Sequence, residues 1–261
     1  MCNTTRMSNK LGMPKDDVLT RISHRLLAAL RFTPLLLALS LAAISPARAD
    51  DVKNPYPAMA PLAQYTMDRT AEIALARSAA PASVSDKAEI LVLGTHGYET
   101  AVKGTNGFVC YVGRSWENNF DNADFWNPKG RGPECVNAAA ARSVLPSYLQ
   151  RTQWVLSGVS RDEMIKQTKA AIAAKQITAP EAGSMCFMLS KEGYLGDDAG
   201  GPWHPHVMFW GPPGPSSEWG ADLPGSPVYS SPSDLLPFTI FFVPVRNWSD
   251  GTPAEYGVQH H

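Results

Sequence analysis

Charged residues are scarce in this chain, and neither sign is concentrated. Of the 261 residues, 18% are charged, and the formal net charge is −1. Residues 1–49 hold seven basic and two acidic side chains, and the remainder has 16 basic and 22 acidic side chains and a net charge of −6. Such a chain has no electrostatic footprint for nucleic acid or an anionic membrane, so we exclude both as partners.

Known catalytic and nucleotide-binding motifs are also missing. The sequence has no Walker, dinucleotide-binding, nucleophile-elbow or kinase signature, and no Ser is followed by Lys three residues later. Hydrophobic residues make up 44% of the chain, and its 20 Gly and 22 Pro follow no three-residue period. The composition therefore indicates a loop-rich globular protein and excludes collagen, but it names no reaction.

The longest apolar run is short and lies near the N-terminus. Arg21, Arg25 and Arg31 precede the run 32–44, which is followed by the small-residue pattern 47–49 (Ala-Arg-Ala). This order is typical of a secretory signal peptide over residues 1–49, cleaved after Ala49. An uncleaved anchor over 26–44 is the alternative, but Arg31 would cost about 2.5 to 3.5 kcal/mol near the bilayer centre. We expect a periplasmic or secreted protein with no stable membrane insertion after cleavage.

Cysteine is rare, and only Cys110, Cys135 and Cys186 remain after the signal peptide. An oxidising compartment allows one disulfide and leaves one thiol. Of the three pairings, we favour Cys110–Cys135, because the loop between them is polar and rich in Gly and Pro. Closing about 25 residues contributes roughly 3 to 4 kcal/mol in a chain-entropy model. Cys186 lies in an apolar run and is interpreted as a buried, inert thiol.

Apolar periodicity predicts a single α+β domain over residues 65–256, after a Pro-rich extended arm at 50–64 and before a tail at 257–261. Helical patterns occupy the middle of this domain, where Ser160 and Glu163 have capping-box spacing. A further helix is expected between Thr66 as its cap and Pro81. The sequence thus predicts an antiparallel sheet of about six strands with a central helical block, the strands being 89–93, 98–103, 107–112, 184–189, 206–210 and 238–245.

The run 200–210 is the strongest candidate for a functional site in the sequence, because it contains His204 and His206. Residues two apart in a strand project from one face, as the ligands of one metal must. With His96 they could hold zinc, and Glu192 or Asp198 could act as a base. Two alternatives stay open: a metal-free pocket that uses these histidines, or a purely structural role.

Tryptophans form the second feature, since most of them lie in or beside turns. Such rings could line a groove for a flat or sugar-like ligand, or they could pin loops onto the core. The Gly-, Pro- and Ser-rich segment 211–237 is long enough to be functional or mobile. The tryptophans concerned are Trp116, Trp126, Trp203, Trp210, Trp219 and Trp248.

Four runs, 88–93, 107–110, 203–209 and 248–253, resemble those of a group of exported bacterial proteins with no assigned function. The resemblance spans most of the chain after residue 49, which implies one domain. It implies no activity, cofactor or catalytic residue.

Two functions are therefore expected from different classes. The first is a non-catalytic periplasmic module that binds a small molecule or an envelope protein through Trp203, His204, His206 and Trp210. The alternative is a metal-dependent hydrolase in which His96, His204 and His206 hold zinc.

Overall fold

The computed structural model describes residues 54–197 and 204–255. The predicted signal peptide, Asp198, Trp203 and the tail 257–261 lie outside these residues. In the described part, no helix is long and apolar enough to cross a membrane. The helices are α1 (Arg69–Arg77), α2 (Ala82–Ser85), α3 (Ala138–Ser143), α4 (Leu145–Leu156) and α5 (Arg161–Ala173), with short 3-10 turns at Leu62–Gln64, Ser115–Glu117 and Ser216–Trp219.

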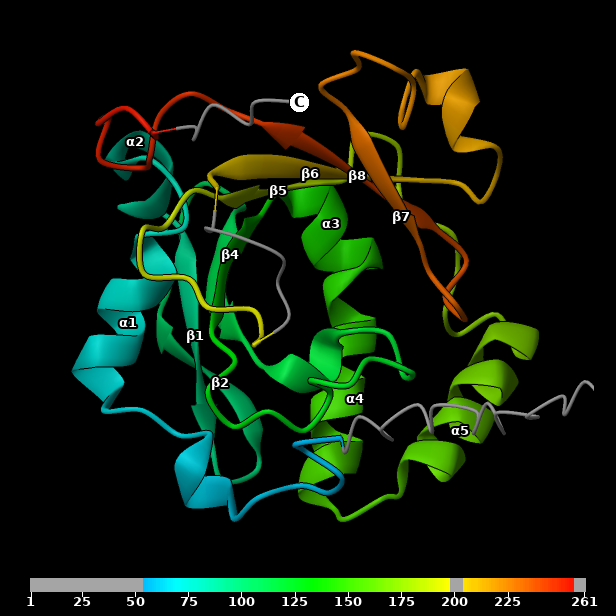
Figure 1. Ribbon diagram of the computed structural model, residues 1–261. Helices are drawn as coiled ribbons and strands as arrows, with labels where there is room; N and C mark the ends of the chain where they lie inside the picture. The colour runs from blue at the N-terminus through cyan, green and yellow to red at the C-terminus, as the bar shows by residue number, and fades with distance from the viewer. Residues whose placement is uncertain (1–53, 198–203, 256–261) are drawn as a thin grey trace, which may run out of the picture. The chain divides into compact units, whose positions relative to one another are not determined.

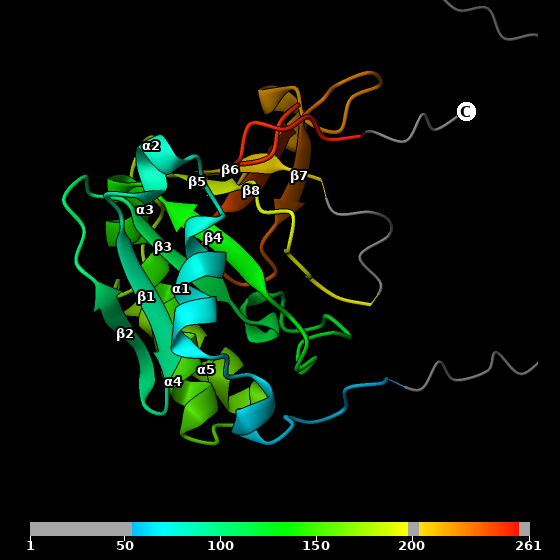
Figure 2. The same cartoon turned by 90° about the vertical axis from the view of Figure 1, so that its left-hand side faces the viewer.

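Within residues 54–197 and 204–255, eight strands form one mixed sheet in the order β2-β1-β3-β4-β5-β6-β8-β7. Helix α1 packs on β1, β3 and β4, while α3 contacts β4 and β5 and α4 contacts β2. Figures 1 and 2 show α1 on one side of these strands and α4 on the other. The strands are β1 (Glu89–Gly94), β2 (Gly97–Val102), β3 (Val109–Gly113), β4 (Gly132–Val136), β5 (Met185–Met188), β6 (His206–Gly211), β7 (Tyr229–Pro232) and β8 (Thr239–Pro244).

The α+β class is confirmed, but the prediction of about six antiparallel strands is wrong. Strand β3 pairs in parallel with β1 rather than with β2. The four residues of β1 from Ile90 to Leu93 are buried, whereas Glu99 and Thr100 of β2 are exposed. A strand that is apolar on both faces belongs inside the sheet, so β2 takes the edge and the chain crosses β1 to reach β3.

Two strands escaped prediction because their residues are typical of turns. Strand β4 begins with Gly132 and Pro133, and β7 reads Tyr-Ser-Ser-Pro. Proline lacks the ladder N–H, so it is tolerated at the start of a strand or at a sheet edge. Pro133 is near the start of β4, and Pro232 ends the edge strand β7.

The helix boundaries follow from local capping. Ser160 accepts a hydrogen bond from the Glu163 N–H at 3.3 Å, which confirms the predicted cap of α5. The expected cap of α1 is wrong: Asp68, not Thr66, accepts from the N–H groups of Thr70 and Ala71. A carboxylate at this position also interacts favourably with the positive end of the helix dipole.

Strand alternation separates the three cysteines. Cys110 and Cys135 are cross-strand partners on the α1 face and lie at disulfide distance, as expected from the sequence. Cys186 lies opposite Val136, so its side chain points to the α4 face, where it is buried and free. The parity of the register therefore keeps Cys186 away from the other two.

Candidate functional site

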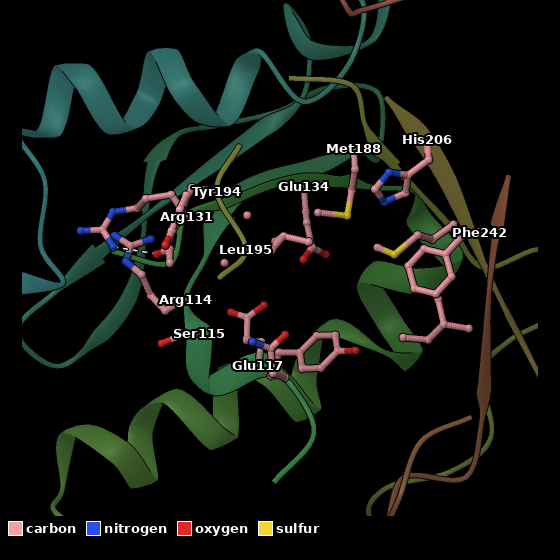
Figure 3. A pocket seen from close by; sticks show the side chains of 17 residues that line it. Arg114, Ser115, Glu117, Arg131, Glu134, Met188, Tyr194, Leu195, His206 and Phe242 are labelled. Carbon is pink, nitrogen blue, oxygen red and sulfur yellow. Dashed lines mark hydrogen bonds between the residues drawn. The ribbon is translucent and has the colours of Figure 1, made fainter. Parts of the chain in front are cut away.

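A cavity of about 180 Å³ lies on the α4 face of the sheet. Figure 3 shows Glu117 and Glu134 reaching into the same space, with Arg114 and Arg131 on one side and Met188, His206 and Phe242 on the other. The lining residues come from β3 and the turn after it, from β4, β5, β6 and β8, and from α4 and the 194–195 segment. The site is thus assembled from segments that are far apart in the sequence.

Local structure places the two carboxyl groups. Glu134 alternates with Cys135 along β4, so it projects to the face opposite the disulfide. Glu117 ends the short 3-10 turn that follows β3. Gly113 lies between them: a Cβ on this residue would be 2.7 Å from Glu117 Oε2 and 3.3 Å from Glu134 Oε1. A side chain at position 113 would therefore collide with the carboxyl pair.

The hydroxyl of Tyr111 bridges the pair. It lies 3.2 Å from Glu117 Oε2 and 3.2 Å from Glu134 Oε2. A phenol has one hydrogen, so it donates to one carboxylate and can only accept from the other. Both contacts are two-centre hydrogen bonds only when one of the two carboxyl groups is protonated.

The electrostatic environment also indicates that one of the two carboxyl groups is protonated. Burial raises the pKa of Glu117 to about 7, against the opposing hydrogen bond from Tyr111. Burial, followed by repulsion from Glu117, raises the pKa of Glu134 to about 8. Neighbouring carboxylates disfavour a second negative charge, and such a pair titrates as a unit. At neutral pH the pair therefore holds about one proton, mainly on Glu134.

The cations beside the pair are held by other groups. Arg114 forms a buried ion pair with Glu72 at 2.7 Å and donates to the carbonyls of Tyr65 and Val112. Arg151 donates to three carbonyls of the turn that carries Glu117, and burial lowers its pKa. Both arginines thus fix the backbone around Glu117 rather than neutralising the pair by direct contact.

Tyr148 is the remaining polar group of interest in the lining. It is only 8% exposed, and its hydroxyl faces the indole N–H of Trp210, which has no other partner within hydrogen-bond distance in the described part. A hydroxyl that lines a cavity is also a group to which a ligand could bind.

A second cavity of about 180 Å³ adjoins the first. The two share five lining residues: Glu117, Asn118, Tyr148, Ile240 and Phe242. The second is more polar, because Asn119, Asn122, Ser231 and Ser233 also line it. Glu117 and Tyr148 are therefore accessible from both spaces.

The structure brings one of the sequence-predicted histidines into this site. His206 lines the cavity, and its Nδ1 donates to the His204 carbonyl at 2.8 Å. Burial lowers the pKa of His206, so its ring is neutral at pH 7. His204 precedes β6 and does not line the cavity, while Trp210 is buried in the core of the same face.

His96 is not brought together with the other two histidines. It lies in the turn between β1 and β2, and three strands separate β1 from β6. Four strand spacings are about 19 Å, far beyond the reach of a shared metal. Among residues 54–197 and 204–255, no group of three or more His, Cys, Asp or Glu could hold a metal ion. The base expected at Glu192 is exposed and outside the cavity.

The described tryptophans mainly pack the protein. Trp116 is fully buried, with Nε1 3.0 Å from the Thr152 hydroxyl, and Trp126 is also buried. Trp219 is 55% exposed and stacks on Phe241 at 4.9 Å on the surface. The segment 211–237 that contains it is not structureless, since it includes a 3-10 turn and β7.

Sequence reasoning missed Tyr111, Glu117, Glu134 and Tyr148 as site residues. One signal for Glu134 was available in the sequence. If Cys135 forms a disulfide with a cysteine in a strand, the segment around Cys135 is expected to be extended, and Glu134 is an acidic residue in that segment. Compared with protein-family models, curated proteins and solved structures, the chain matches none.

Proposed function

We propose that this chain is an exported protein that binds a small molecule in the cavity around Glu117 and Glu134. The observation that carries the proposal is that Glu117 and Glu134 both contact the Tyr111 hydroxyl and both line the cavity. Partly buried carboxyl groups without a contacting cation destabilise a fold, so their presence in a pocket favours a role in binding. The pattern in residues 21–49 and the Cys110–Cys135 pair support export.

The proposed site includes one of the residues expected from the sequence, but its polar contacts come from other residues. His206 remains as a neutral wall residue, while Glu117, Glu134 and Tyr148 provide the polar contacts. Met188, Met208, Ile240 and Phe242 supply an apolar side. A few polar groups on an otherwise apolar wall are typical of small-molecule sites.

A thermal-shift screen of sugars, amino acids, amines and nucleosides tests binding. We expect one of these classes to raise the melting temperature of the wild type and of the control Glu192→Gln, which removes an exposed carboxylate outside the cavity. The shift should be lost in Glu134→Gln. A flat response from every class, or an undiminished shift in Glu134→Gln, would contradict the proposal.

A second candidate function is acid–base catalysis by the same pair. It is favoured by the different protonation states of Glu117 and Glu134 at neutral pH, because cleavage of a glycosidic bond uses one carboxylic acid and one carboxylate. Hydrolysis of chromogenic glycosides should then fall by about 100-fold or more in Glu117→Gln and stay unchanged in Glu192→Gln. Absence of turnover by the wild type would leave binding as the function.

A further inference from the structure

We propose that the ligand of this cavity is a small organic cation with a primary ammonium group, which binds between Glu117 and Glu134 in exchange for a proton. This inference rests on the proposed binding function and names the ligand class. Three features of the cavity favour such a ligand: its hydrogen-bond acceptors, nearby arginines that already have partners, and an apolar remainder of the wall.

The carboxyl pair and Tyr148 offer acceptors to a ligand. Glu117 and Glu134 present carboxyl oxygens, and the Tyr148 hydroxyl lines the same cavity beside the Trp210 indole. An ammonium group has three donors and no acceptor. The three donors match the three side chains, and the hydroxyl of Tyr148 can accept while its hydrogen is directed elsewhere.

The arginines at the other side of the cavity do not form an anion clamp. Arg131 donates from Nη1 to the carbonyls of Pro128 and Gly130 and from Nη2 to that of Gln64. Arg114 is held by Glu72 and by two carbonyls. A carboxylate or phosphate ligand would have to approach Glu117 and Glu134 without a free bidentate guanidinium, so an anionic ligand is disfavoured.

The remainder of the wall favours an organic cation over a metal ion. Met188, Met208, Ile240 and Phe242 form an apolar side next to the pair. A divalent metal prefers several oxygen or nitrogen ligands, and the described residues provide no group of three. An alkylammonium ion places its charge at the carboxyl groups and its chain on this apolar side, where the Phe242 ring can also face the cation.

The other ionisable groups that face the pair keep their charge state between about pH 7 and pH 9. Burial raises the pKa of the Cys186 thiol on β5 and of the phenols of Tyr98, Tyr111 and Tyr148, so all four stay neutral. Burial lowers the pKa of His206 on β6, so its ring is neutral at pH 7 and above, and Arg131, whose pKa burial lowers to about 10, stays charged below about pH 9. The groups that change charge in this range are Glu117 and Glu134 themselves.

An exchange of cation for proton has a measurable signature. A bound ammonium favours the ionised pair, so the pair releases about one proton per ligand near pH 7. The apparent affinity should rise by up to tenfold per pH unit between about pH 7 and pH 8, and then level off as the free pair becomes ionised. A neutral ligand of the same shape would show neither effect.

Isothermal titration calorimetry with propylammonium chloride tests the inference. Titrations near pH 7 in phosphate and in HEPES, which differ in ionisation enthalpy, give the number of protons released. We expect about one proton, and no binding of 1-propanol or propionate at the same concentration. Glu134→Gln should weaken propylammonium binding by about tenfold or more and reduce the proton release, because only Glu117 can then lose a proton, while Glu192→Gln should bind as the wild type does.

The variant is expected to fold, because glutamine closely matches the shape of the protonated Glu134 side chain; a thermal melt verifies this. Tyr148→Phe provides a second variant, which should weaken binding severalfold and leave the proton release in place. Binding of 1-propanol or propionate without proton release would overturn the cation inference and leave the proposed binding function standing. If propylammonium at about 10 mM does not bind, the inference is also overturned, whereas the library screen still decides the proposed function.

Discussion

The hydroxyl oxygen of Tyr111 lies 3.2 Å from a carboxyl oxygen of Glu117 and 3.2 Å from a carboxyl oxygen of Glu134. One carboxyl group comes from a turn after β3 and the other from the neighbouring strand β4. Their proximity is therefore a property of the β3–β4 pairing, in which Tyr111 is opposite Glu134. Changes that affect this pairing should affect the carboxyl pair and its cavity together.

Replacing Tyr111 with phenylalanine removes the bridging hydroxyl and keeps the ring. We expect Tyr111→Phe to lower the free energy of unfolding by about 1 to 3 kcal/mol, because it leaves the two carboxyl groups without their shared partner. Tyr229→Phe is the matched control, since Tyr229 is exposed on the edge strand β7 and should change stability by less than about 0.5 kcal/mol. Chemical denaturation measures both, and equal effects would contradict a special role for Tyr111.

The carboxyl pair should make stability depend on pH in a defined direction. The folded-state pKa of Glu134 is raised to about 8, above its value in the unfolded chain, so the folded state binds more protons. The associated stability is present below about pH 4.5 and is lost as the pH rises through about 8. Urea denaturation across this range should show a fall for the wild type that is smaller in Glu134→Gln by about 1 kcal/mol or more. Identical pH profiles would refute the raised pKa.

The buried ion pair of Glu72 and Arg114 fixes the backbone that leads to the site. Glu72→Gln leaves a charged guanidinium in a buried position and should cost about 3 to 5 kcal/mol of stability. Glu181→Gln removes a partner of the exposed pair with Arg142 and should cost less than about 1 kcal/mol. Thermal denaturation distinguishes them, and a cost for Glu72→Gln as small as for Glu181→Gln would show that the buried pair is dispensable.

The three cysteines should behave differently towards thiol reagents. Non-reducing peptide mapping should find Cys110 joined to Cys135, and Cys186 should react with maleimide only after unfolding, because it is buried. Cys110→Ala combined with Cys135→Ala should lose about 3 kcal/mol, the value for closing a loop of this length. A disulfide that contains Cys186 would contradict the observed strand register.

Export has its own test, which does not depend on the cavity. Protein recovered from the periplasm or medium should have Asp50 as its first residue, as the Ala-Arg-Ala pattern at 47–49 predicts. Intact-mass measurement reads this directly. An N-terminus upstream of Arg31, or recovery only with the membrane fraction, would contradict signal cleavage.

The sequence allowed good prediction of features that depend on near neighbours. The Ser160 cap of α5 and the strand that contains Cys110 follow from residues a few positions apart. The parallel pairing of β1 with β3 and the strand character of β4 were missed, because strand order depends on burial across the whole sheet. Only the pairing of β3 with β4 brings Glu134 to Tyr111, so no local pattern could predict the carboxyl pair.

The most direct test of the shared proton, on which both functional proposals depend, is a pH titration of the glutamate side-chain carbons by ¹³C NMR. The Glu117→Gln and Glu134→Gln variants assign the two signals. We expect both carboxyl groups to titrate above about pH 6 in coupled steps, with Glu134 the last to lose its proton. Two independent titrations near pH 4.3, the ordinary value for glutamate, would contradict the account.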